Sequence, residues 1–449
     1  MKQYDAIIVG GSSTGSYFAR QLGKQGFSVL VVEASSEDKV GTNYNIFHMN
    51  KTDFTRFNLP LPKENEDKAY EFTGSDALSA YDHYPKPHEL TMIGMHKHAW
   101  LMRLIGEAKK AGVKYQFASP LTDLILKDNR VIGIKCKDKK GEKEYYGKLI
   151  ADCSGIPSVA RVKLPENYGV ENFEISDTEQ FYVTLRYAKY KHEKDYVKRQ
   201  RTWPFYKTWE APSADPTGAI LGVGATLNFE KGERIYGEFE KAVKLPEYEV
   251  EYLERGTTPY RRPPYSFVSD SFIAMGDCAC LTKPHLGEGV TSSMVQVDIA
   301  ADVIGKLLKE KKDLSRENLW PINKFYVEEQ GKTFAGMLAT LIGATTSTAK
   351  ENEFFFKEDI IFSKASFAAM AKDQNITFST SEMIGVAMKM VKGVVTGKLS
   401  IKTINILLKA MKNSEAITLH YDQFPTTPEG FEAWCATADK LWQACGKMT

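Results

Sequence analysis

The sequence lacks any apolar run of about 18 residues or more, the length that a membrane-spanning helix requires. It also lacks a strong charge of either sign, and a net charge of +2 does not indicate a nucleic-acid partner. Its six cysteines show no metal-binding spacing, and there are no internal repeats or low-complexity tracts. Because a predicted strand begins as early as Ala6, we expect no signal peptide. These absences favour a cytoplasmic globular protein with reduced cysteines and no metal.

The composition is ordinary, with 43% hydrophobic and 26% charged residues, and 449 residues are enough for two or three domains. One detail is the pair Cys278 and Cys280, which stand a single residue apart. A redox pair is one interpretation. Packing of small apolar side chains is favoured, because this spacing strains a disulfide.

The first informative segment is residues 4–33, which has the pattern of a dinucleotide-binding unit. An apolar strand over Ala6–Val9 leads into a glycine-bearing turn at 10–15, and a helix follows from about 16 to 24. A second strand over 27–32 ends at Glu33. In such a unit the helix N-terminus faces a pyrophosphate, and the acid accepts hydrogen bonds from the ribose hydroxyls.

Individual residues of the turn have separate roles in this interpretation. Gly10 permits the tight turn, and Gly15 lets the helix approach the strand. Ser12 stands where the usual fingerprint has its middle glycine, so its side chain must fit beside the phosphates or bond to them. A unit of this kind without a ligand and an NAD(P) site are the alternatives.

The second informative segment lies far along the chain, where a strand over 271–275 stops at Gly276 and Asp277. A loop then runs through Pro284, Gly287 and Gly289 into a helix that starts near Val290. An aspartate in this position bonds a ribityl hydroxyl, and the helix N-terminus stabilises negative charge on a reduced flavin ring. The two segments together predict one FAD site.

A middle segment, 149–161, is predicted to return the chain to the adenosine side of the same sheet. The predicted cofactor-binding residues are Gly10, Ser12, Thr14, Gly15, Glu33, Ala34, Lys97, Asp152, Gly155, Gly276, Asp277, Pro284, Gly287, Gly289 and Val290.

These three segments resemble the flavoprotein superfamily of p-hydroxybenzoate hydroxylase type. Within it the chain is most similar to the geranylgeranyl reductase family, including archaeal digeranylgeranylglycerophospholipid reductases. The resemblance extends to a basic-proline segment at 258–263, TPYRRP, and to a C-terminal segment at 419–434. It implies that reduced flavin delivers a hydride from N5 to one carbon of an isoprenoid C=C bond, while a proton reaches the other carbon. An apolar, lipid-like molecule is then the expected partner.

The chain departs from the family pattern in the region Val40–Met49, which has no counterpart of the family's cysteine near the flavin. His48 and Tyr44 are the polar candidates there, and His285 in the flavin loop is a third candidate proton donor. Lys97 or His98 stands in place of the superfamily's arginine beside the flavin. The segment 203–209 is the candidate for the family's aromatic substrate segment, although its order differs.

The expected fold class is α/β (α+β overall), with a Rossmann-like FAD-binding domain, an inserted antiparallel-sheet substrate domain and a mostly helical C-terminal region. We assign residues 1–50, 91–164 and 265–310 to the discontinuous FAD domain. Residues 165–264 form the substrate domain together with an irregular, polar excursion at 51–90, and residues 311–449 form the helical domain.

Residues 383–412 combine apolar positions with six lysines and no acid, and glycines 393 and 397 are expected to split them into two helices. Peripheral contact with a membrane and a core-packed helical lid with a solvated lysine face are both open.

Three functions also stay open. The favoured one is an FAD-dependent reductase of isoprenoid C=C bonds. The alternatives are an FAD-dependent hydroxylase of an aromatic or lipid substrate, and an electron-transfer or non-catalytic flavoprotein. A ferredoxin, a flavodoxin or NAD(P)H could supply the electrons.

Overall fold

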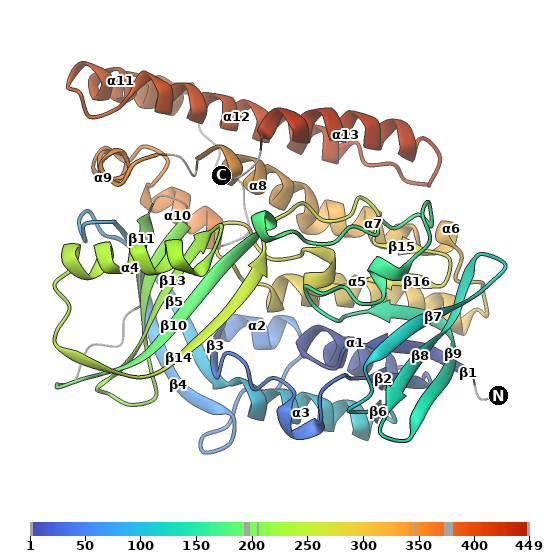
Figure 1. The fold of residues 1–449 in the computed structure, drawn as a ribbon. Helices are drawn as coiled ribbons and strands as arrows, with labels where there is room; N and C mark the ends of the chain where they lie inside the picture. The colour runs from blue at the N-terminus through green and yellow to red at the C-terminus, as the bar shows by residue number, and fades with distance from the viewer. Residues whose placement is uncertain (1–2, 193–197, 204–205, 345–346, 372–379, 447–449) are drawn as a thin grey trace.

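The computed structural model describes residues 3–192, 198–203, 206–344, 347–371 and 380–446. Two multi-stranded sheets form its centre, and helices of the C-terminal region lie across both (Figure 1). The predicted fold class is therefore confirmed. Pro204 and Phe205, which belong to the predicted aromatic segment, lie outside the described residues.

The first sheet has the strand order β15-β16-β9-β1-β2-β6, and β8 joins it beside β9 with β7 next to it. Its strands are β1 (Gln3–Val9), β2 (Val29–Val32), β6 (Lys114–Gln116), β7 (Leu121–Lys127), β8 (Arg130–Asp138), β9 (Gly141–Asp152), β15 (Val268–Ser269) and β16 (Phe272–Ala274).

The parallel register of this sheet brings the predicted cofactor segments to one edge. Val9 at the end of β1 pairs with Val32 of β2 and with Asp152 of β9, and Ala274 of β16 pairs with Asp152 from the other side. The four strands thus end level with one another, so the turns that follow them are neighbours in space. Ligands of parallel α/β sheets bind beyond such strand ends.

Three helices cover this sheet: α1 (Ser13–Lys24), α3 (Lys97–Lys110) and α5 (Val290–Lys309). α1 packs against both of the others. The approach of α1 to β1 depends on Gly15, because a Cβ there would overlap the carbonyl oxygen of Gly10. The apolar strand residues Ala6, Ile7 and Ile8 lie beneath these helices and are completely buried.

The second sheet has the order β14-β10-β13-β12-β11-β4-β5-β3 and is antiparallel except where β11 runs parallel to β4. Its strands are β3 (Ile46–Asn50), β4 (Lys68–Ser79), β5 (Lys86–His96), β10 (Gln180–Tyr190), β11 (Lys198–Trp203), β12 (Tyr206–Pro212), β13 (Gly218–Thr226) and β14 (Tyr248–Pro259). α4 (Phe229–Ala242) packs against β13 and β10.

The prediction that residues 51–90 are irregular was wrong. After the short helix α2 (Lys51–Arg56) they form β4 and the start of β5, which pair with each other over most of their length. Tyr70 and Phe72, two residues apart, are buried on one face of β4, whereas Glu71 and Thr73 are more exposed. The prolines lie before β4 and near the start of β5, where they interrupt little of the ladder.

The C-terminal region is helical, as predicted. Its helices are α6 (Arg316–Leu319), α7 (Pro321–Tyr326), the π-helical turn Val327–Gly331, α8 (Lys332–Ala344), α9 (Ala349–Lys357), α10 (Lys364–Ala371), α11 (Thr380–Val395), α12 (Ile401–Asp422) and α13 (Phe431–Cys445). The expected break within 383–412 falls at 396–400, where Gly397 has a positive φ of 64°. Gly393 is instead part of α11 and packs against Leu399. No helix in the described ranges has the length and apolar character to cross a bilayer.

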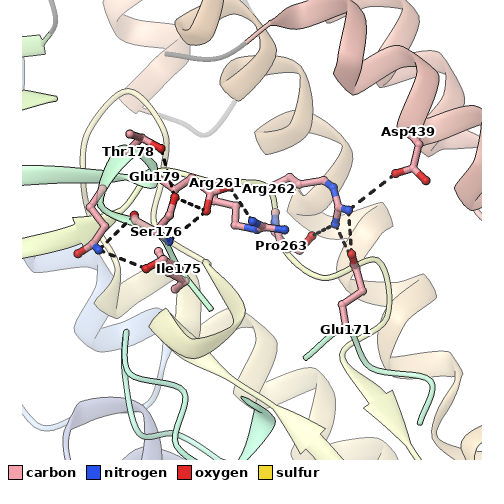
Figure 2. Close-up of polar contacts among 10 residues, drawn as sticks. Glu171, Ile175, Ser176, Thr178, Glu179, Arg261, Arg262, Pro263 and Asp439 are labelled. Atoms are coloured by element: carbon pink, nitrogen blue, oxygen red, sulfur yellow. Dashed lines mark hydrogen bonds and ion pairs between the residues drawn. The ribbon is translucent and has the colours of Figure 1, made fainter. Parts of the chain in front are cut away.

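The basic-proline segment, residues 258–263 at the end of β14, connects different parts of the molecule (Figure 2). Arg262 forms ion pairs with both carboxylate oxygens of Glu171, at 2.8 Å each, and reaches Asp439 of α13 at 3.9 Å. Arg261 pairs with Glu179 at 2.6 Å, directly before β10. These two arginines therefore connect the second sheet, the loop after β9 and the C-terminal helices.

The packing at Gly15 generates a stability prediction. Gly15→Ala should lower the free energy of unfolding by about 2 kcal/mol or more, because the new methyl group meets backbone that cannot move aside. The matched control is Gly106→Ala in α3, where a Cβ meets nothing within 4 Å. It should leave stability unchanged or raise it by about 1 kcal/mol. Urea unfolding of both variants checks this, and equal stabilities would contradict the packing argument.

Candidate functional site

The turns after β1 and β16 touch each other directly. Gly276 has a φ of +72°, and a Cβ there would stand 2.7 Å from Oγ1 of Thr14, at the start of α1. Gly10 has a φ of +100°, and a Cβ there would overlap the carbonyl oxygen of Cys153, just after β9. The first, middle and last predicted segments thus form one continuous backbone surface at the sheet edge, as a shared cofactor requires.

Glu33 lies at this edge with its carboxylate fixed by the backbone. Oε2 accepts a hydrogen bond from the Gly11 N–H at 2.7 Å, and Oε1 accepts one from the Ser35 N–H at 2.7 Å. The side chain is half-buried, and Ala34 beside it is exposed. Glu33 therefore presents an oriented carboxylate at the position where a ribose would lie.

The N-terminus of α1 opens toward the same space. Ser12 is the N-cap residue and has an extended backbone, but its side chain makes no capping hydrogen bond with the described residues. The first N–H groups of the helix are therefore available to an anion. The predicted contact between the Ser12 side chain and a pyrophosphate stays a prediction.

Asp152 is completely buried and bonded to its own loop. Its Oδ2 accepts hydrogen bonds from the N–H groups of Ala160 and Arg161, at 3.0 and 2.7 Å, and Oδ1 accepts from Ser154. Gly155, with a φ of +77°, turns the chain within this loop. Asp152 thus holds the loop in place, and the surface offered to an adenosine group is that of the loop itself.

Asp277 and the following loop form the other half of the site. Asp277 is half-buried and accepts a hydrogen bond from Thr282 at 3.3 Å. Burial raises its pKa, against the opposing effects of Thr282 and Lys97. A Cβ on Gly289 would stand 3.0 Å from the Asp277 carboxylate, so this position has little room for a side chain. The loop continues through buried Pro284 and through Gly287, whose φ is +71°.

α5 begins at Val290, as predicted, and Gly289 is its N-cap, without a side-chain capping bond from the described residues. Two helix N-termini therefore face the strand-end surface, that of α1 and that of α5. Their partial positive charges suit a pyrophosphate at α1 and a polar ring edge at α5.

Lys97 lies next to Asp277 and His98 does not. The Lys97 Nζ donates to the carbonyl oxygen of Asn43 at 3.0 Å and stands 5.6 Å from the centre of the Tyr44 ring. Burial lowers the pKa of Lys97, whereas the charge of Asp277 acts to raise it. His98 instead bonds the Val40 carbonyl at 2.7 Å. Of the two predicted replacements for the superfamily's arginine, Lys97 is the one near the flavin side.

Tyr44 lies against β14, with its hydroxyl where a Cβ on Gly256 would be. Burial raises the pKa of Tyr44, and the nearby charges of Glu254 and Asp277 add to that effect. The phenol is therefore a neutral group close to Asp277, and it is available as a hydrogen-bond donor rather than as an ion.

His48 is part of an aromatic cluster on the second sheet. Its Nε2 lies 2.6 Å from the Tyr70 hydroxyl, and its ring meets Tyr70 and Phe72 edge-on at 5.6 Å. Burial lowers the pKa of His48 to about 3, and the charge of Lys198 contributes. The imidazole is therefore neutral at physiological pH.

His285 lies in the flavin loop beside a charged group that the sequence analysis missed. Lys207, on β12, donates from Nζ to the Leu286 carbonyl at 2.7 Å and to Gln200 at 3.2 Å. Burial and the charge of Lys207 lower the pKa of His285 to about 4. Burial and the charge of Lys198 lower the pKa of Lys207 itself to about 7, although Glu288 opposes this.

Glu288 is the acid at the centre of these lysines. Burial raises its pKa, but the charges of Lys283, Lys198 and Lys207 outweigh burial and hold the pKa below its usual value. Lys283 pairs with it at 3.4 Å. Glu288 lies between Gly287 and Gly289, which were predicted to bind flavin. The glycine pattern could therefore have identified Glu288 as a residue of the site. Lys283 lies in the same loop, whereas Lys198 and Lys207 come from strands of the other sheet, and nothing in their local sequence separates them from surface lysines.

A cavity of about 970 Å³ adjoins the loop and the start of α5. Polar and charged side chains from β3, α2, β4, β5, the loop before α5 and α5 itself line part of it, among them Asn50, Asp53, Arg56, Asp76, His88, Lys283 and Ser292. Apolar side chains also line it, among them Leu90, Val295 and Ala368. The space beside the loop thus has both a polar and an apolar boundary.

Cys278 and Cys280 are buried free thiols within the described chain. The Cys278 Sγ donates to the Asp152 carbonyl at 2.9 Å, which fastens the last segment to the end of β9. Burial raises the pKa of both thiols, so neither is activated as a thiolate. This arrangement supports the packing interpretation over the redox pair.

The residues at the strand ends fit FAD. They supply the positive-φ glycines, an oriented acid for the ribose, uncapped helix N-termini and a half-buried aspartate next to a glycine-lined loop. These features lie on both sides of one edge, in the order that an extended dinucleotide requires.

No known protein-family model matches the chain. Among solved structures, it is similar to a geranylgeranyl bacteriochlorophyll reductase-like protein from Thermoplasma acidophilum, with a TM-score of 0.70, 16% identity, and coverage of 88% of this chain and 98% of that one. It is also similar to a flavin-dependent brominase, with a TM-score of 0.62, 15% identity, and coverage of 88% and 100%. Fold and site together define an FAD-dependent oxidoreductase.

In sequence, the chain is 23% identical to digeranylgeranylglycerophospholipid reductase of Sulfolobus acidocaldarius, over 98% of this chain and 97% of that protein. The homologous protein of Haloferax volcanii is 25% identical over 70% of this chain and 79% of its own length. The predicted resemblance to the geranylgeranyl reductase family is confirmed.

The geometry of Glu33 generates a binding prediction. Glu33→Gln should raise the dissociation constant of FAD about tenfold or more, because an amide turns an N–H₂ group toward one of the two backbone donors and removes an acceptor. Fluorescence titration of the apoprotein with FAD measures the effect. Glu37→Gln, an exposed acid nearby, is the control and should bind FAD like the wild type. Equal constants for all three proteins would exclude a ribose contact.

Proposed function

We propose that the protein reduces C=C bonds of an isoprenoid, geranylgeranyl-type lipid with a hydride from reduced flavin. The similarity to digeranylgeranylglycerophospholipid reductase supports this most, because it spans 98% of this chain and so includes the substrate side as well as the cofactor segments. The likeness to halogenases and monooxygenases supports the fold alone. A ferredoxin, a flavodoxin or NAD(P)H are all compatible electron donors.

The two boundaries of the cavity suit such a lipid. The apolar lining at Leu90 and Val295 offers a surface for an isoprenoid chain, and hydrocarbon buried there gains about 25 cal/mol per Å². The polar lining near Asp53 and Arg56 offers hydrogen bonds to a polar end of the substrate. Burial of the reacting bond against the second sheet also excludes water from it.

The residues at the strand ends would bind and orient FAD, and the loop at 282–289 would lie beside its flavin. FAD, when reduced, supplies the hydride for one alkene carbon. The N-terminus of α5 and the Lys97 ammonium are placed to stabilise negative charge on that side of the site. The chain must then provide one proton for the second carbon.

We propose that His285 relays that proton: one ring nitrogen takes a proton from the Lys207 ammonium as the other gives its proton to the alkene carbon. At neutral pH His285 is a neutral imidazole with one N–H, whereas Lys207 is near half-protonation. Lys207 is only 8% exposed and contacts the loop at Leu286, so its proton is shielded from bulk water. His48 is neutral and bonded to Tyr70, and the Tyr44 hydroxyl packs against Gly256 of β14, so we give them the role of shaping the pocket.

The reaction class can be tested without oxygen. The flavin is reduced anaerobically with dithionite and then mixed with geranylgeranyl lipids, quinones or phenols. Reoxidation by the geranylgeranyl lipid, with a product heavier by two hydrogens per bond, is the expected result. A hydroxylated product that forms only when oxygen and NAD(P)H are present would instead identify a hydroxylase.

The proton groups generate a pH prediction. The rate of flavin reoxidation by substrate should fall as the pH rises through about 7, because protonated Lys207 is then lost. His285→Ala should lower this rate about 100-fold and leave FAD bound. Lys207→Gln should remove the falling limb near pH 7. Stopped-flow absorbance at the flavin band measures all of these rates.

Lys198→Gln serves as the matched variant. The charge of Lys198 lowers the pKa of Lys207, so its removal should move the falling limb to higher pH without abolishing it. A limb that stays at the same pH in both lysine variants would exclude Lys207 as its origin. A wild-type rate in His285→Ala would remove that histidine from the mechanism.

A further inference from the structure

An apolar stripe on α11 faces solvent. Ile384, Met388, Val391 and Val395 recur at spacings of four, three and four residues, so they lie on one face of the helix. Their exposed fractions are 58%, 65%, 63% and 81%. The opposite face packs on α9 and α12, where Met390 is only 5% exposed. The stripe therefore contributes nothing to the core, and water contacts side chains that would gain free energy from burial.

α12 continues this apolar surface. Ile401, Leu408 and Leu419 share the face of α12 that points away from α8, and they are 65%, 53% and 59% exposed. The inward face carries buried Leu407 and Ile417. Figure 1 shows α11 and α12 along the outer edge of the molecule, beyond α8 and α9. We call the exposed faces of α11 and α12 the α11–α12 surface.

Positive charge surrounds this surface. Between residues 383 and 414 the chain has six lysines and no acid, and the exposed acids Glu382 and Glu415 stand just outside this span. Lys389 turns inward to the Glu358 carbonyl, and Lys392 pairs with the Glu358 carboxylate at 2.9 Å. The remaining four are exposed and have no ion pair with any described residue: Lys398, Lys402, Lys409 and Lys412.

We propose that the α11–α12 surface docks onto an anionic lipid bilayer, with both helices lying in the plane of the interface. Apolar side chains on one face flanked by lysines are the pattern of helices that bind there. A second copy of the chain fits less well, because a two-fold contact would bring this lysine-rich surface against itself. A helical lid with a solvated lysine face explains the packed inner side of α11 but not its exposed apolar stripe.

Vesicle sedimentation with the full chain tests the proposal. The protein should sediment with vesicles of phosphatidylcholine containing about 30% phosphatidylglycerol and much less with pure phosphatidylcholine. The triple variant Ile384→Ser, Met388→Ser, Val391→Ser should lose at least about tenfold in partition. Lys402→Glu with Lys409→Glu should lose about fivefold or more per lysine, and salt at about 0.5 M should weaken the wild type.

Val250→Ser with Leu253→Ser is the matched control. These residues of β14 are also exposed, at 44% and 52%, but they belong to the second sheet and not to α11 or α12. This variant should bind vesicles like the wild type. All proteins should keep the same molar mass by light scattering. Absence of wild-type binding to anionic vesicles, unchanged binding of the serine triple variant, or a dimer that the triple variant abolishes would each overturn the proposal.

Discussion

The close meeting of four strand ends at one edge of the first sheet is the constraint on which the rest of the structure depends. β1, β2, β9 and β16 end in register, and the turns beyond them have no space for side chains at Gly10, Gly15 and Gly276. Backbone from residues 10–15, 153–155 and 276–277 can then form one surface. Because these segments are far apart in sequence, the site exists only when the whole sheet has formed.

The second sheet depends on this arrangement through the loop at 282–289. Lys207 of β12 donates to the Leu286 carbonyl, and Arg261 and Arg262 hold the end of β14 near β9 and α13. The loop is thus held between the first sheet, which supplies Asp277, and the second sheet, which supplies buried lysines. The same contact that positions the flavin loop also removes Lys207 from water and lowers its pKa.

Features that depend on a few neighbouring residues could be predicted from the sequence. The end of the first strand at Val9, the end of α1 at Lys24 and the start of α5 at Val290 are found at the predicted residues, since turn residues and apolar runs specify them locally. The strands β4 and β5 were missed, because their alternation is weak and their stability comes from pairing with β11 and β3. The charged group around Glu288 was missed because Lys198 and Lys207 meet it only through tertiary structure.

Charged side chains lie beside apolar side chains at two places in this molecule, with different physical results. Around Glu288 the lysines are buried, so they are held by an acid and a carbonyl, and desolvation brings a pKa into the range where a proton moves at neutral pH. On α12 and the turn before it the lysines are exposed, and the apolar side chains near them stay in water. In the buried group around Glu288, desolvation shifts a lysine pKa so that a proton can move. On the exposed helices, the charge of the lysines can attract an anionic surface. A lipid substrate would need both, because it must leave a bilayer before its double bond reaches a dry site.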